Sequence, residues 1–122
     1  MDHSPKFLAL VEDAKKRVRE IPLAQLKERQ ARGEALLLVD VREDHEWAKG
    51  RIPGARHMGR GVLERDIEKE VPDTGREIIL YCGGGFRSML AADNLLKMGY
   101  ANVSSLAGGW RGWVGSGGPV EK

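Results

Sequence analysis

Cysteine is almost absent from this sequence, since Cys82 is the only one among 122 residues. A single cysteine excludes an internal disulfide framework and any redox motif built from paired cysteines. It also cannot complete a common structural zinc site, and the histidines His3, His45 and His57 are not at metal-ligand spacing. We therefore expect no metal, no cofactor and a thiol that stays reduced, as it would in the cytoplasm.

Long apolar runs and a strong net charge are missing as well. No stretch approaches the roughly 20 apolar residues of a membrane-spanning helix, and residues 1–19 are too charged for a signal peptide. Lys and Arg number 20 and Asp and Glu 18, a balance that does not favour nucleic-acid binding. With 41% hydrophobic and 31% charged residues, the composition is typical of a soluble globular protein, and the length fits one domain.

Apolar runs alternate with helical patterns along the chain. The runs at 35–41 and 77–81 are typical of strands covered on both faces, and shorter strands are expected at 20–22, 55–58 and 102–106. The helical patterns predict helices at 5–18, 23–32, 43–49 and 87–98, a short one at 108–114, and one or two turns within 62–71. This alternation predicts an α/β fold, a mostly parallel sheet with helices on both faces.

Cys82 stands where the apolar run 77–81 ends and the stretch CGGGFRS (82–88) begins. The carboxyl end of a buried strand is where open α/β sheets bind ligands. Consecutive glycines let successive backbone N–H groups converge on one point, and the following helix adds its positive end. Both effects favour a thiolate, so the pattern predicts a nucleophilic Cys82. A small buried hydrophobe is the alternative, but such a residue has no use for three adjacent glycines.

The length of this loop narrows the chemistry. Cysteine-dependent phosphatases use a loop with five residues between cysteine and arginine, whereas here Arg87 follows Cys82 after four. A loop that is one residue short for phosphate suits a smaller group. A single sulfur atom carried on the thiolate fits this description.

Several motifs together resemble those of the rhodanese family of sulfurtransferases, in their single-domain form. Five occur in the family's order: LVDVRE (38–43), EW with a later glycine (46–50), IPGA (52–55), CGGGFRS (82–88) and LAGGWRGW (106–113). The resemblance covers about 21–114 and implies a five-stranded parallel sheet flanked by helices. We interpret residues 1–122 as one such domain, with an added N-terminal helix at 5–18 and a flexible tail at 115–122.

The resemblance implies a two-step transfer of a sulfane sulfur. Cys82 would take the outer sulfur of thiosulfate or of a thiol persulfide and become a persulfide. Cyanide, a thiol or a sulfur-carrier protein would then accept that sulfur. The terminal sulfur would be held by the loop, with the Ser88 hydroxyl as an added donor and backbone N–H groups from Gly83, Gly84, Gly85, Phe86, Arg87 and Ser88.

Three arginines are candidates for binding an anionic donor. Arg87 either binds the donor or pairs with a carboxylate that rigidifies the loop, and the two roles are compatible. Gly83 stands where some relatives have a basic residue, so the donor is open; Arg60 is a candidate replacement or an ordinary surface arginine. Arg42 could add positive potential near the thiolate, although a buried ion pair with Asp40 is the preferred interpretation.

Two other functions remain open at this point. The first is a persulfide carrier or sensor that binds a partner and turns over poorly. The second is a cysteine phosphatase or arsenate reductase on the related fold with a longer loop. Multiple turnover would exclude the first, and phosphatase activity would favour the second over sulfur transfer.

Overall fold

The computed structural model describes residues 3–122. Its sheet has five strands in the order β1-β5-β4-β2-β3, namely β1 (Arg19–Ile21), β2 (Leu38–Asp40), β3 (Arg56–His57), β4 (Ile78–Tyr81) and β5 (Val103–Leu106). Every pair of neighbouring strands is parallel. The predicted α/β fold is therefore confirmed.

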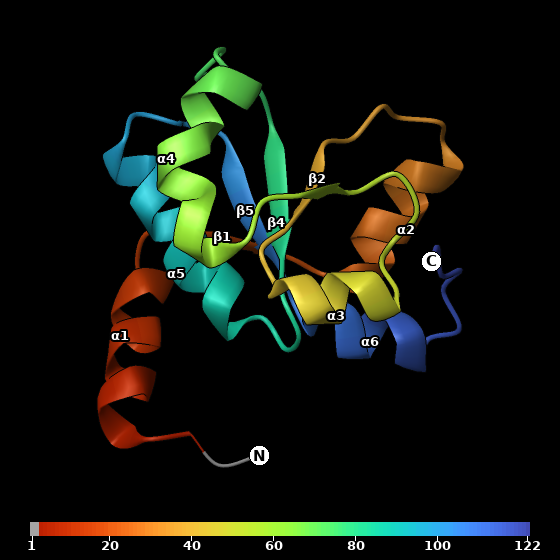
Figure 1. The fold of residues 1–122 in the computed structure, drawn as a ribbon, viewed down its shortest axis with the longest axis horizontal. Coiled ribbons are helices and arrows are strands. Elements are labelled where there is room, and N and C mark those ends of the chain that lie inside the picture. Colours follow the sequence, from red (N-terminus) through yellow and green to blue (C-terminus); the bar gives the residue numbers. More distant parts are fainter. Residues whose placement is uncertain (1–2) are drawn as a thin grey trace.

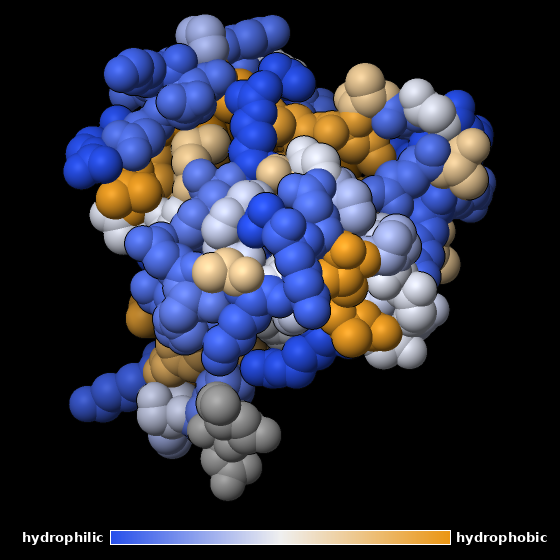
Figure 2. Space-filling view, turned by 45° about the vertical axis from the view of Figure 1, so that its right-hand side comes forward, coloured by the Kyte–Doolittle hydropathy of each residue, from blue (hydrophilic) through white to orange (hydrophobic). Residues whose placement is uncertain are grey.

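Helices cover both faces of this sheet (Figure 1). One side carries α1 (Pro5–Lys15), α4 (Arg60–Glu70) and α5 (Phe86–Lys97), and the other carries α2 (Leu23–Ala31), α3 (Asp44–Lys49) and α6 (Gly109–Gly115). Hydrophilic side chains dominate the face in Figure 2, where apolar ones form separate patches. Across residues 3–122, no helix combines the length and the apolar character needed to cross a membrane.

Strand β4 supplies the centre of both helix–sheet interfaces. Ile78 and Leu80 belong to the apolar cluster beneath α1, α4 and α5, whereas Ile79 and Tyr81 belong to the cluster beneath α2 and α6. All four side chains are fully buried, as expected for a continuous apolar run between two helix layers. Cys82, the residue directly after this buried strand, therefore lies at the carboxyl edge of the sheet.

Helix α1 is anchored firmly to the rest of the molecule. Val11 and Ala14 are buried against the core. The Arg17 guanidinium, just after the helix, donates hydrogen bonds of 2.7 and 2.8 Å to the Asp93 carboxylate on α5. The same guanidinium holds the pKa of Asp93 below its ordinary value. Helix α1 ends earlier than predicted because the chain must turn after Lys15 to enter β1.

The C-terminal tail at 115–122, predicted to be flexible, makes specific contacts with the rest of the molecule. Arg51 and Glu121 exchange backbone hydrogen bonds of 3.0 and 2.9 Å. The Trp113 indole N–H donates to the Pro119 carbonyl oxygen at 2.7 Å. The partners of the tail lie far away in the sequence or on α6, which a local reading of a glycine-rich segment cannot detect.

Candidate active site at Cys82

Cys82 follows β4 directly and is almost completely buried, with 1% of its surface exposed. Its Sγ accepts a hydrogen bond of 3.1 Å from the Gly85 N–H and lies 3.4 Å from Ser88 Oγ. Gly85 has a left-handed conformation (φ 103°) and precedes the first residue of α5. Because glycine adopts this conformation readily, the loop can fold back and aim an N–H group at the sulfur.

A pair of buried hydroxyl groups lies behind the sulfur. Ser88 Oγ is 2.7 Å from Ser105 Oγ on β5, and both side chains are fully buried. A serine hydroxyl has one proton and two acceptor positions. When Ser105 donates to Ser88, the Ser88 proton is free to point at the Cys82 sulfur. Sequence analysis missed Ser105, because its proximity depends on β5 lying beside β4.

The start of α6 holds the outer side of the loop. The N–H groups of Trp110 and Arg111 donate to the carbonyl oxygens of Cys82 and Gly83 at 2.8 and 3.0 Å. Gly109 has φ +52°, and a Cβ there would collide with the Cys82 carbonyl oxygen. These contacts occupy the carbonyl oxygens of Cys82 and Gly83 and hold the loop in the conformation in which the Gly85 N–H donates to the sulfur.

Arg87 joins the loop to α3. Its guanidinium donates two hydrogen bonds, of 2.7 and 3.1 Å, to the Glu46 carboxylate. Hydrogen bonding to Arg87 lowers the pKa of Glu46 to about 2. The Glu43 N–H also donates to Glu46, at 3.0 Å. Of the two roles predicted for Arg87, pairing with a carboxylate is the one that is observed.

A hollow of about 330 Å³ opens above Cys82, and Arg111 forms part of its wall. A Cβ added to Gly84 would lie 2.7 Å from Arg111 Nη1, so the guanidinium rests directly against the loop. Within residues 3–122 Arg111 forms no ion pair, whereas Arg87 is committed to Glu46. Among the described residues, Arg111 is therefore a cation without an ion-pair partner in the wall of this hollow, and sequence analysis missed it. The sequence signal that could have identified Arg111 was its position in the motif LAGGWRGW, after the last strand.

The chain matches the rhodanese-like domain family over residues 22–116. It belongs to this family. It is 36% identical to a sulfurtransferase of Allochromatium vinosum over 103 residues, 84% of this chain and 94% of that protein. It is 34% identical to the thiosulfate sulfurtransferase GlpE of Stutzerimonas stutzeri over 82 residues, 67% of this chain and 73% of that protein.

A solved structure from Rhodopseudomonas palustris superposes on this rhodanese-like domain with a TM-score of 0.85. The two chains are 29% identical, and the match covers 99% of each. That protein is of unknown function and is described as a possible tyrosine phosphatase. The fold is therefore shared over the whole length, including the segment before the family match.

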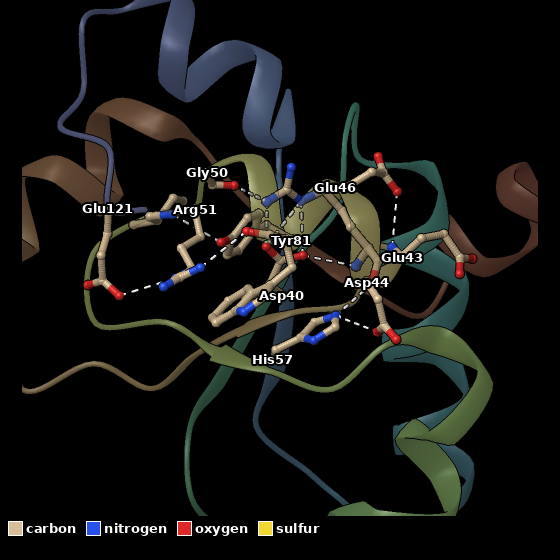
Figure 3. A network of polar contacts seen from close by, with 12 residues as sticks. Asp40, Glu43, Asp44, Glu46, Gly50, Arg51, His57, Tyr81 and Glu121 are labelled. Carbon is tan, nitrogen blue, oxygen red and sulfur yellow. Dashed lines mark hydrogen bonds and ion pairs between the residues drawn. The ribbon is translucent and has the colours of Figure 1, made fainter.

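The two arginines Arg42 and Arg60 do not line the hollow above Cys82 in this rhodanese-like domain. Arg42 is buried and donates to the Asp40 carboxylate and to the Gly50 carbonyl oxygen, each at 2.7 Å. Figure 3 shows Asp40 and Gly50 gathered in this network. The predicted ion pair of Arg42 with Asp40 is confirmed, and its charge is therefore offset. Arg60 Nη1 donates to the Arg87 carbonyl oxygen at 3.4 Å, a contact with the backbone rather than with the sulfur.

A stack of three side chains supports α3, the helix that presents Glu46. The Trp47 ring lies 4.8 Å from the His57 ring at an interplanar angle of 11°, and the Arg51 guanidinium lies 4.5 Å from the Trp47 ring. Figure 3 shows Arg51 and His57 in the same region as Glu46. Trp47 is half-buried in this stack.

Proposed function

We propose that this protein is a sulfurtransferase that moves a sulfane sulfur from an anionic donor of the thiosulfate type through a persulfide on Cys82. The observation that carries the proposal is the contact of 3.1 Å between the Cys82 sulfur and the Gly85 N–H, at the start of α5. A backbone donor and a helix N-terminus both stabilise negative charge at that point. Similarity to the thiosulfate sulfurtransferase of Stutzerimonas stutzeri supports this class of donor.

In the first step the Cys82 thiolate attacks the outer sulfur of thiosulfate. A new S–S bond forms on Cys82, the bond between the two thiosulfate sulfurs breaks with its electron pair, and sulfite leaves. A thiolate and a dianion become a persulfide anion and a dianion, so no proton or redox partner is required. Arg111 is placed to hold the anionic oxygens of the donor, since a guanidinium suits such groups.

In the second step an acceptor attacks the outer sulfur of the persulfide. Cyanide leaves as thiocyanate, a thiolate leaves as a thiol persulfide, and in both cases the electron pair of the broken S–S bond returns to Cys82. The Gly85 N–H supports the negative charge on Cys82 before and after this exchange. A free thiol of this kind needs a reducing compartment, so a cytoplasmic location is part of the proposal.

A cysteine phosphatase is the rival function, since the similar structure from Rhodopseudomonas palustris is that of a possible tyrosine phosphatase. The loop argues against it, because only four residues separate Cys82 and Arg87. Arg87 is also occupied by Glu46 and would have to leave it before binding phosphate oxygens. We expect no hydrolysis of aryl phosphates by this protein.

The test is the intact mass after incubation with thiosulfate under non-reducing conditions, followed by cyanide. We expect a gain of one sulfur atom that cyanide removes as thiocyanate, over many cycles per protein molecule. Cys82→Ser should gain no sulfur while keeping its melting temperature, because the two side chains have similar shapes. An unchanged mass, with Cys82 still open to alkylation, would exclude thiosulfate as donor. A yield that stops at one thiocyanate per protein would favour the persulfide carrier.

A further inference from the structure

The hollow above Cys82 has an aromatic wall that comes from outside the family match. His3 and Phe7 line the hollow together with Phe86, whereas the match begins at residue 22. The ring of Phe86 meets His3 edge to face at 4.7 Å and Phe7 at 6.2 Å, with interplanar angles of 85° and 87°. These are the geometries that aromatic side chains prefer. The N-terminal segment therefore adds a surface that the rhodanese-like core lacks.

This wall is held in place by the anchoring of α1. Val11 and Ala14 are each 1% exposed on the face of the helix that meets the core. Arg17 and Asp93 add the hydrogen-bonded ion pair to α5, the helix that begins with Phe86. Phe7 therefore lies on a supported helix next to the site, and His3 lies just before that helix, which allows both rings to act as a binding surface.

The hollow is larger than an inorganic donor such as thiosulfate needs, and its wall combines charged and aromatic side chains. Its volume of about 330 Å³ lies at the lower end of the roughly 300–1,000 Å³ found for small-molecule sites. Its lining combines the aromatic wall and Cys82 with charged side chains, namely Arg111, Arg87 and Glu46. Thiosulfate would use the cation and the sulfur but would leave the rings without a partner.

We propose that His3 and Phe7 select sulfur donors in which an apolar or aromatic group is attached to the anionic, sulfur-bearing head. This inference rests on the proposed sulfur transfer and specifies its substrate class. For an organic thiosulfonate, the Cys82 thiolate forms an S–S bond with the terminal sulfur. The bond between that sulfur and the sulfonyl sulfur breaks with its electron pair, and a sulfinate leaves. Charge and oxidation state balance without a further reactant.

The experiment compares benzenethiosulfonate with methanethiosulfonate, two donors that differ only in the group attached to the same reacting head. We expect kcat/KM for the benzene donor to be roughly tenfold higher, because the ring is buried against the aromatic wall. Phe7→Ala and His3→Ala should each reduce this ratio toward one. Leu10→Ala is the matched control, since Leu10 is on the same helix but is 61% exposed, and it should keep the ratio.

The possible failures are distinguishable. Equal kcat/KM for the two organic donors in the wild type, with turnover of thiosulfate intact, would overturn the inference and leave the proposed function standing. A ratio unaffected by both Phe7→Ala and His3→Ala would overturn the role of the wall. Absence of sulfur transfer from all three donors would overturn the proposed function itself. Should Phe7→Ala lower the melting temperature, His3→Ala carries the test, because His3 precedes the helix.

Discussion

Around Cys82, individual polar atoms determine what the loop can hold. The sulfur has a backbone donor on one side and the Ser88 hydroxyl on the other. Ser88 is in turn oriented by Ser105 from the neighbouring strand. Because these groups are buried, removal of one partner leaves the other without a replacement from water.

The hydroxyl pair predicts a specific loss of stability. Ser105→Ala should lower the free energy of unfolding by about 1–3 kcal/mol, the usual cost of an unpartnered buried polar group. It should also slow persulfide formation, since Ser88 is no longer held toward the sulfur. Urea unfolding and the rate of sulfur uptake are the measurements. Ser104→Ala is the matched control on β5, because no hydrogen bond of the Ser104 hydroxyl is found within residues 3–122. Equal effects in both variants would contradict the role of the pair.

Arg111 predicts a defect in donor binding. Arg111→Ala should raise the KM for thiosulfate roughly tenfold, as expected for loss of a charge-assisted contact, with a smaller change in kcat. Arg111→Lys should recover part of the loss, because a lysine keeps the charge but not the planar fork. Steady-state kinetics at fixed ionic strength measure both. Arg65→Ala, an exposed arginine on α4, is the control. An unchanged KM in Arg111→Ala would remove this residue from the binding site.

At the scale of elements, the Glu46–Arg87 pair connects α3 to the loop that carries Cys82. Helix α3 is short, with 6 residues, and none of them is buried. Such a helix has no buried side chain that would hold it against the rest of the molecule. The ion pair and the stack of Trp47 with His57 and Arg51 therefore fix its position.

This connection predicts a dependence of stability on acid. The pKa of Glu46 is lowered to about 2 from an ordinary value of 4.5. A carboxylate with a depressed pKa contributes stability that is complete above the ordinary value and is lost as the pH falls toward the lowered one. Between pH 4.5 and 2, the wild type should lose about 1–3 kcal/mol more than Glu46→Gln. Urea unfolding across this range measures the difference, and Glu70→Gln, an exposed residue on α4, should behave as the wild type. Parallel curves for Glu46→Gln and the wild type would refute the coupling.

At the scale of the whole molecule, two helix layers share one sheet. Leu80 and Ile79 are adjacent in β4, are both fully buried and face opposite layers. Trp110 and Trp113 report by fluorescence on the layer that contains α6. We propose that the two layers unfold together, as one domain.

A core substitution tests this proposal. Leu80→Ala and Ile79→Ala should each cost about 2–5 kcal/mol, the usual range for a buried large-to-small change. In Leu80→Ala, which damages the layer of α1, α4 and α5, tryptophan fluorescence and far-UV circular dichroism should still give coincident transitions. A fluorescence transition that stays at the wild-type midpoint while the dichroism shifts would divide the chain into two units.

Much of the candidate site was predictable because it is local in the chain. The strand 77–81, the glycines after it and the helix after them are contiguous, so their patterns predict Cys82 at a strand end. The Asp40–Arg42 pair was predictable for the same reason, since only one residue lies between its members. The contacts of Ser105 and of the C-terminal tail were not predictable, because each joins residues far apart in the sequence.

The sequence by itself determined the family, the alternating α/β order and the strand–loop–helix unit that holds Cys82, since each depends on contiguous residues or on motif order. Only the tertiary structure decided which charges and rings surround the sulfur. It pairs Arg87 with Glu46, brings Arg111 of α6 against the loop, and places Phe7 beside Phe86. The physical reason is that strand order and helix packing determine which distant segments meet, and no local pattern records that outcome.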